Sequence, residues 1–233
     1  LRNSSAASDV YKRQTQPGLR TKAYFRTTLT APKEDLIPLP RTATELNGPT
    51  FDQRDVGDVG TDLTLGNIIV GSRMIVEGRV LDEDGRPVPN ALVEMWQANA
   101  AGKYPHEVDS RPAPLEEDFI GAGRMLTDAD GKYRFTTVRP GAYPVPNTNN
   151  WWRPPHIHFS LYGHAFASRL ITQMFFPGDP LNDLDGILQA IPTPEGRDRL
   201  IAKPDAGIGE HEHSLGFSFD IVLRGREETP MVD

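Results

Sequence analysis

The amino-acid sequence predicts a mainly β protein, an antiparallel β-sandwich with long loops and a few short helices. Short runs of alternating apolar and polar residues are bounded by turn clusters, and helical spacing is rare. The 233 residues include 21 glycines and 21 prolines, well above the roughly 12% that these two residues together contribute to average proteins. Many tight turns between short strands account for that composition.

Four segments have the pattern of strands, namely residues 74–80, 91–97, 132–138 and 215–224. In the third, Tyr133, Phe135 and Thr137 alternate with more polar residues. The fourth has the longest alternation, so we expect one half-buried strand there. Asp130-Gly131 predicts a hairpin turn.

Helical signals occur in two places. Residues 184–191 have apolar side chains at helical spacing. Thr193-Pro194-Glu195 combines a capping residue, a first-turn proline and an acid, which predicts the start of a short helix.

The chain divides into three parts by composition. Residues 1–20 lack periodicity and include LRNSSAASDVYKRQ, which we expect to be a disordered or non-native segment. Residues 21–72 are rich in Thr and Pro, as expected for an extended N-terminal arm. Residues 73–233 are predicted to form the sandwich domain, which would carry the chemistry.

Composition excludes several classes of function. The chain has no cysteine, so disulfides, iron–sulfur clusters and thiol catalysis are excluded and a metal would need His, Asp, Glu or Tyr. No apolar run reaches the roughly 18 residues of a membrane span, and the N-terminus lacks the apolar core of a signal peptide. We therefore expect a cytoplasmic protein without membrane contact.

Charge is unevenly distributed. Residues 1–35 carry seven Lys or Arg and three acids, whereas 18 bases and 29 acids follow. The basic residues of the arm are scattered rather than clustered, so we expect subunit contact and not nucleic-acid binding.

The sharpest local feature is residues 151–160, WWRPPHIHFS. In a strand, His156 and His158 point to one face while Ile157 and Phe159 point to the other. An isolated H-x-H is more often two solvated histidines, but the apolar and aromatic surroundings favour a shared metal ion here.

Four other histidines provide a contrast. His211 and His213 have the same spacing in a polar, glycine-rich loop, and we expect them to be solvated. His106 and His164 lie in turn-like contexts and are expected at the surface or behind the site.

Two histidines leave a metal site incomplete, and no carboxylate has the spacing of a facial triad. Tyr104 and Tyr143 lie in predicted loops after strands, where functional groups are often placed. Each tyrosine alone would more often be structural, so the pair is a candidate only together with the histidines.

The order Tyr104, Tyr143, His156 and His158, with gaps of 39, 13 and 2 residues, resembles the intradiol ring-cleaving dioxygenases. The resemblance runs from about residue 24 to residue 226. It is densest in residues 87–99, 152–159 and 170–176. It implies a prealbumin-like sandwich in which residues 73–233 form the catalytic domain.

The resemblance also implies the chemistry. These four residues would hold a non-haem Fe(III), and the protein would cleave a catechol with O₂, converting protocatechuate to 3-carboxy-cis,cis-muconate in aromatic catabolism. Two phenolates and one hydroxide balance the charge of ferric iron in a protein interior. A catechol dianion that replaces the hydroxide and one tyrosinate conserves that charge, and the family identifies Tyr143 as the displaced ligand.

Further roles follow from the resemblance alone. Arg153 matches an arginine that stabilises negative charge developing on the ring. Gln173 and Trp96 match pocket residues, although either could also belong to the core. Tyr24 matches a tyrosine that contacts the substrate from the arm.

Three positions depart from the protocatechuate-cleaving members. Those members commonly have Trp and a basic residue after Gly-Ala-Tyr-Pro, where this chain has Val145 and Pro146, and an arginine where Thr30 stands. Loss of an aromatic wall and of positive charge weakens recognition of a carboxylated ring. We therefore expect an altered or relaxed pocket, with catechol or hydroxyquinol as alternative substrates.

Two other classes of protein remain open. Residues 78–93 and 127–135 also resemble non-enzymatic prealbumin-like binding modules, and Asp128 and Asp130 there lack the remaining ligands of a calcium loop. A zinc hydrolase is less favoured because no H-E-x-x-H motif is present. For partners, the resemblance implies a related α subunit without the iron ligands, or a homo-oligomer.

Overall fold

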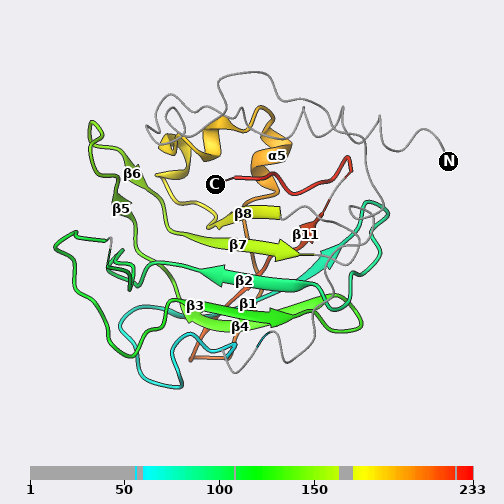
Figure 1. Ribbon diagram of the computed structural model, residues 1–233, viewed down its shortest axis with the longest axis horizontal. Coiled ribbons are helices and arrows are strands. Elements are labelled where there is room, and N and C mark those ends of the chain that lie inside the picture. Colours follow the sequence, from blue (N-terminus) through cyan, green and yellow to red (C-terminus); the bar gives the residue numbers. More distant parts are fainter. Residues whose placement is uncertain (1–55, 57–59, 108, 163–169, 224, 233) are drawn as a thin grey trace.

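The computed structural model describes residue 56 and residues 60–107, 109–162, 170–223 and 225–232. The expected segment 1–20 and most of the expected arm lie outside the described residues, and so do Tyr24, Thr30 and His164. Within the described part of the chain, two larger sheets and one two-stranded sheet form the architecture (Figure 1).

The first sheet is built around β1 (Arg73–Leu81), which pairs with β4 (Lys132–Val138), β10 (Leu215–Ser218) and β11 (Ile221–Val222). The short β9 (Lys203–Pro204) pairs with β10. β1 is antiparallel to β4 but parallel to β10 and β11. The predicted β-sandwich is confirmed, but these two pairings of the first sheet are parallel and not antiparallel as expected. Parallel neighbours need a long connection, and most of the chain lies between β1 and β10.

The second sheet is antiparallel, as predicted. Its strand order is β3 (Ala122–Leu126), β2 (Leu92–Trp96), β7 (His156–Tyr162) and β8 (Leu170–Phe175). A separate hairpin-like pair, β5 (Tyr143–Pro144) and β6 (Trp152–Arg153), directly precedes β7 (Figure 1). The predicted segments 74–80, 91–97 and 132–138 are thus confirmed as β1, β2 and β4.

Aromatic side chains join the two sheets. Tyr133 and Phe135 of β4 lie 5.8 and 6.0 Å, ring centroid to ring centroid, from Phe159 of β7. All three rings are buried. The alternation predicted for residues 132–138 is confirmed, and its apolar face forms the sandwich core together with the face of β7 that carries Ile157 and Phe159.

The strand predicted over residues 215–224 is interrupted. The backbone N–H of Arg79 donates to the side chain of Asp220 rather than to a backbone carbonyl, which separates β10 from β11. The Phe219 carbonyl accepts the Tyr133 hydroxyl and lies against Gly78, where an added Cβ would come within 1.8 Å of that oxygen. The Phe219 N–H still donates to the Glu77 carbonyl of β1 at 2.9 Å. The ladder is therefore interrupted at Asp220, next to the contacts that Phe219 makes with two other strands.

The helical pattern at residues 184–191 forms two 3-10 turns instead of one helix, η1 (Asn182–Leu184) and η2 (Leu188–Ala190). Asp185 separates them, because its carboxylate accepts the backbone N–H groups of Ile187 and Leu188. The predicted capped helix is confirmed as α5 (Pro194–Asp198), in which the Thr193 hydroxyl accepts the Gly196 N–H at 3.1 Å.

The segment that carries these turns packs beside β8 around a second apolar cluster (Figure 1). That cluster consists of Phe175, Ile187, Leu188, Ile191, Leu200 and Val232. In the part of the chain that is described, no helix has both the length and the apolar character needed to cross a membrane.

Candidate metal centre

His156 and His158 occupy alternate positions at the start of β7 and share one face of the second sheet. Ile157 and Phe159 point the other way and are fully buried in the sandwich core. The two Nε2 atoms lie 3.2 Å apart. The predicted convergence of the histidines is confirmed.

Two tyrosines complete the cluster from other parts of the chain. Tyr104 comes from the loop after β2, and its hydroxyl lies 3.5 Å from the hydroxyl of Tyr143. The Tyr143 hydroxyl in turn lies 3.2 Å from Nε2 of His156. Tyr143 begins β5 rather than lying in a loop, and Arg153 is its partner on β6. Four donor atoms from distant segments therefore meet at one point.

Neighbouring groups outside the donor cluster fix the ring orientations of both histidines. His156 donates from Nδ1 to the Pro154 carbonyl at 2.7 Å, which leaves the lone pair of Nε2 toward the cluster. His158 is oriented by Trp96, its cross-strand neighbour on β2. The indole of Trp96 stacks on the His158 ring with ring planes 6° apart. Nδ1 of His158 is buried and has no hydrogen-bond partner among the described residues.

The protonation states favour ligand chemistry at the histidines. Burial, followed by the nearby Arg153 guanidinium, lowers the pKa of His156 well below its ordinary value and that of His158 to about 3. Both imidazoles are therefore neutral near pH 7 and keep a lone pair for a metal. Burial, followed by Tyr143, raises the pKa of Tyr104 well above 10. Its phenolate needs a cation close by.

These donors fit one metal ion. Ligand atoms that each lie about 2 Å from a common ion are roughly 3 Å apart, close to the spacing of this cluster. Within the described ranges, no three His, Cys, Asp or Glu side chains are grouped so that they could hold a metal ion by themselves. The cluster can thus hold a metal only with phenolate oxygen, a hard anionic donor suited to a highly charged cation.

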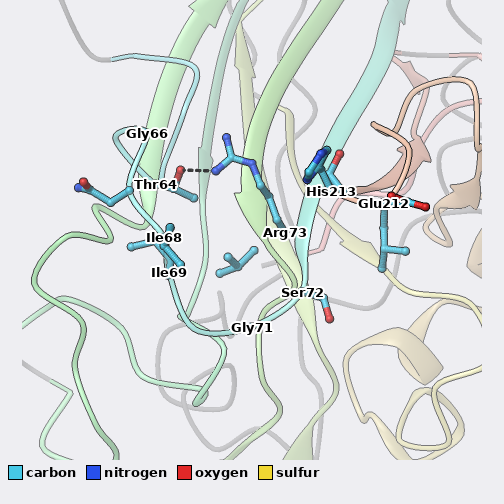
Figure 2. Close-up of a pocket in the computed structure, with 13 residues that line it drawn as sticks. Thr64, Gly66, Ile68, Ile69, Gly71, Ser72, Arg73, Glu212 and His213 are labelled. Carbon is cyan, nitrogen blue, oxygen red and sulfur yellow. Dashed lines mark hydrogen bonds between the residues drawn. The ribbon is translucent and has the colours of Figure 1, made fainter.

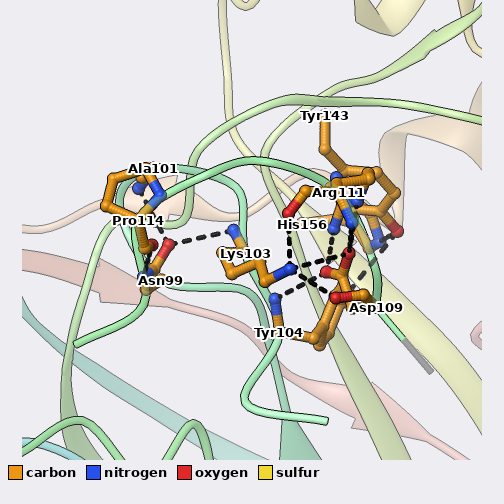
Figure 3. A network of polar contacts seen from close by, with 9 residues as sticks. All are labelled: Asn99, Ala101, Lys103, Tyr104, Asp109, Arg111, Pro114, Tyr143 and His156. Atoms are coloured by element: carbon orange, nitrogen blue, oxygen red, sulfur yellow. Dashed lines mark hydrogen bonds and ion pairs between the residues drawn. The ribbon is translucent and has the colours of Figure 1, made fainter. Parts of the chain in front are cut away.

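A partly buried ionic network supports the loop that carries Tyr104 (Figure 3). The Asp109 carboxylate accepts the Tyr104 backbone N–H at 2.9 Å and binds Arg111 through two hydrogen bonds. Lys103 donates to the backbone carbonyls of Asp109 and Arg111. The Asn99 side chain closes the same loop by accepting the Lys103 N–H.

This network also reaches the second tyrosine. The Arg111 guanidinium lies 4.4 Å from the centre of the Tyr143 ring, within the range of a cation–π contact (Figure 3). Sequence reasoning missed Lys103, Asp109 and Arg111. The only available signal was the group of charged residues on both sides of Tyr104 in the chain.

The predicted Arg153 is buried beside the cluster, with 4% of its surface exposed. Its Nε donates to Asp185 at 2.6 Å, and its Nη2 donates to the side-chain oxygen of Gln173. Gln173 is the cross-strand partner of His158. The structure thus brings Arg153, Gln173 and Trp96 around the histidines, together with Asp185, which sequence reasoning missed.

The remaining predicted residues lie elsewhere. His211 and His213 are exposed, as expected, and so is His106. Val145 is half-buried shortly after Tyr143, whereas Pro146 is exposed.

A surface hollow of about 700 Å³ occupies a different part of the molecule (Figure 2). It is lined by residues between 64 and 73, by Val138 and by residues 212–215. None of the four donor residues lines this hollow, so it is separate from the metal cluster.

Comparisons with known proteins agree with this geometry. A family model described as "Dioxygenase" matches residues 46–225. The protocatechuate 3,4-dioxygenase beta chain of Burkholderia cepacia is 53% identical over 205 residues, which are 86% of each chain. The alpha chain from the same organism is 30% identical over 166 residues, covering 70% of this chain and 78% of that relative.

A solved structure has a similar fold. The 3-chlorocatechol 1,2-dioxygenase of Rhodococcus opacus 1CP superposes with a TM-score of 0.55 at 25% identity. The match covers 69% of this chain and 63% of that one.

Proposed function

The chain belongs to the family of intradiol ring-cleaving dioxygenases, and we propose from this premise that it cleaves protocatechuate with O₂ at a ferric ion, giving 3-carboxy-cis,cis-muconate. The observation that carries the proposal is the meeting of two tyrosine hydroxyls and two histidine Nε2 atoms, with neighbouring atoms 3.2 to 3.5 Å apart. Neither a non-enzymatic binding module nor a zinc hydrolase would require two tyrosine hydroxyls and two histidine nitrogens at one point.

Tyr104, Tyr143, His156 and His158 would hold the metal. When bound, non-haem ferric iron supplies a Lewis acid and redox centre that makes a catecholate reactive toward O₂. Two phenolates reduce the charge of a trivalent ion in a buried site, and the neutral imidazoles add none. This balance supports ferric iron over a divalent ion.

Tyr143 would accept a proton from the substrate. A catechol must lose protons to bind as a dianion, and the Tyr143 oxygen would accept one of them. Tyr143 is suited to leave because it lies on a strand of only two residues, whereas both histidines lie on a seven-residue strand of the core. Arg111 over its ring would stabilise the phenolate form.

Arg153 would stabilise negative charge that develops on the substrate ring. A guanidinium does not lose its proton in proteins, and a charge fixed in a buried site acts more strongly than one in water. Arg153 is held on two sides, by Asp185 and by Gln173. Gln173 and Trp96 would form part of the pocket wall, and Tyr24 of the arm, which lies outside the described residues, would contact the substrate.

The half-buried Val145 and the exposed Pro146 favour a pocket that discriminates weakly between protocatechuate and other catechols. Neither side chain can form a charge-assisted hydrogen bond to a ring carboxylate. We therefore infer that discrimination against catechol is weak. Catechol and hydroxyquinol are the alternative substrates.

The domain organisation and the partners are part of the same proposal. Residues 73–233 would form the catalytic domain, residues 21–72 an arm, and residues 1–20 a disordered or non-native segment. An alpha and a beta chain of one enzyme are both similar to this chain, which supports assembly with a related α subunit or with further copies. Mass measurement with and without a candidate partner tests this, and an active monomer would refute it.

Purified protein reconstituted with ferric iron tests the reaction itself. We expect about one iron per site, consumption of one O₂ for each protocatechuate, and a muconate-type diacid as product. Protein that binds iron at these residues without consuming O₂ would contradict the proposed reaction.

A further inference from the structure

A buried ion pair lies directly behind the candidate metal centre and joins Arg153 of β6 to Asp185. Asp185 Oδ2 lies 2.6 Å from Nε of Arg153, and the side chains are 0% and 5% exposed. A buried charge needs a partner because it has lost its hydration. We propose that Asp185 is a positioning residue, which fixes the Arg153 guanidinium and, through it, the amide of Gln173 at the substrate site. This inference rests on the proposed function.

Asp185 is itself held rigidly. Its Oδ1 accepts the backbone N–H groups of Ile187 and Leu188 at 2.9 and 2.8 Å, and its own N–H closes the turn of η1. Ile187 and Leu188 belong to the apolar cluster beside β8. One carboxylate oxygen is thus engaged by the backbone, and the other is directed at Arg153.

The contact continues from Arg153 to the sheet that carries the histidines. Arg153 Nη2 donates to Oε1 of Gln173, which defines which end of the amide faces the arginine. The opposite end, Nε2 of Gln173, is buried and has no hydrogen-bond partner among the described residues. Gln173 faces His158 across the β7–β8 pair. An oriented donor is therefore available next to the metal cluster.

Charge gives Asp185 a second effect on the site. The buried Arg153 guanidinium lies beside the metal donors as the cross-strand partner of Tyr143, so its charge would oppose a metal cation. The Asp185 carboxylate offsets that repulsion while leaving the guanidinium in place. Asparagine at position 185 has nearly the same shape but removes this charge.

The test compares Asp185→Asn with Asp179→Asn. Asp179 is a matched control because one of its oxygens also binds an arginine, Arg139, at 3.2 Å and the other accepts the Leu181 N–H. A misplacement of about 1 Å can cost about 100-fold in rate. We expect kcat of Asp185→Asn to fall about 100-fold with KM changed less than about threefold, and Asp179→Asn to stay within about threefold of wild type.

A double-mutant cycle separates positioning from a general structural effect. If Asp185 acts through Arg153, Asp185→Asn should lower kcat less than about threefold in an Arg153→Gln background. Asp185→Glu should recover part of the wild-type rate. The visible band of the anaerobic substrate complex should shift in Asp185→Asn but not in Asp179→Asn, which gives a readout independent of turnover.

Three results would overturn the inference. They are a wild-type kcat in Asp185→Asn, an equal loss in the Arg153→Gln background, and identical spectra in Asp185→Asn and wild type. If Asp185→Asn does not fold, Asp185→Glu decides. Its side chain is one methylene longer and would displace the carboxylate from Arg153 and from the N–H groups of Ile187 and Leu188, so an unchanged kcat and an unchanged spectrum there would also overturn the inference. Failure of the wild-type protein to turn over any catechol would refute the proposed function, whereas wild-type turnover with any of these three results refutes only the role of Asp185.

Discussion

Trp96 lies almost parallel to His158, with ring centroids 4.8 Å apart and ring planes 6° apart. A metal-binding histidine is usually oriented by a hydrogen bond from its second nitrogen. Nδ1 of His158 has no such partner in the described part of the chain. Stacking on the indole of Trp96 therefore orients this imidazole in place of a hydrogen bond.

Trp96→Ala should weaken metal binding. Loss of a support behind a metal ligand typically costs 10- to 100-fold in affinity, and we expect a loss of about tenfold because stacked aromatic pairs contribute about 0.5–1.5 kcal/mol. Competition with a chelator measures the affinity. Trp96→Phe, which keeps a ring, should lie between wild type and Trp96→Ala, and equal affinities in all three proteins would contradict the orienting role.

The two H-x-H pairs should respond oppositely to mutation. His156→Ala or His158→Ala removes one of four donors and should abolish stoichiometric iron binding and turnover. The double variant His211→Ala/His213→Ala changes only exposed side chains and should keep both. Metal analysis of purified proteins checks this, and loss of iron in the second variant would place the centre elsewhere.

The wild-type protein should discriminate only weakly between protocatechuate and catechol. Two substitutions should restore a preference for protocatechuate. We expect kcat/KM for protocatechuate and for catechol to agree within roughly tenfold, because Val145 and Pro146 offer the carboxylate no charged partner. Val145→Trp combined with Pro146→Arg should raise the preference for protocatechuate by tenfold or more, since hydrogen bonds to charged groups contribute about 1.5–3 kcal/mol. Strong wild-type preference for protocatechuate would refute the relaxed pocket.

The stabilising effect of Asp109 should depend on pH. Burial opposes ionisation of Asp109, but hydrogen bonds from Arg111 and from the Tyr104 N–H lower its pKa far below the ordinary value. A group with a lowered folded-state pKa stabilises the protein above its unfolded-state pKa, about 3.9, and loses this effect as the pH falls toward the folded-state pKa.

Asp109→Asn should therefore destabilise the metal-free protein at pH 7 and have a smaller effect near pH 3. Urea unfolding of both proteins at the two pH values measures the difference in the free energy of unfolding. A difference that stays constant with pH would show that the Asp109 charge does not contribute.

Local patterns predicted much of the fold and the core of the candidate site. The alternation around Tyr133 and Phe135 predicted β4 correctly because one face of that strand is buried. Thr193 predicted the start of α5 because capping depends on neighbouring backbone groups. His156 and His158 could be predicted to share a face because side chains alternate along any strand.

Features that depend on distant contacts could not be predicted. Asp185 lies 32 residues from Arg153 in the chain, and no local pattern links them. The interruption between β10 and β11 involves the Arg79 N–H and the Tyr133 hydroxyl, which belong to other strands. The parallel pairing of β1 with β10 depends on the path of the whole chain between them.

The central claim, a ferric site with two tyrosinates, is tested most directly by the visible spectrum of the iron-loaded protein during anaerobic titration with protocatechuate. We predict a tyrosinate-to-iron absorption band before substrate is added and a shift of that band at one equivalent, as Tyr143 is displaced. Tyr143→Phe should retain an absorption band from Tyr104 alone. A colourless protein with stoichiometric zinc, or an iron band that substrate leaves unchanged, would contradict the account.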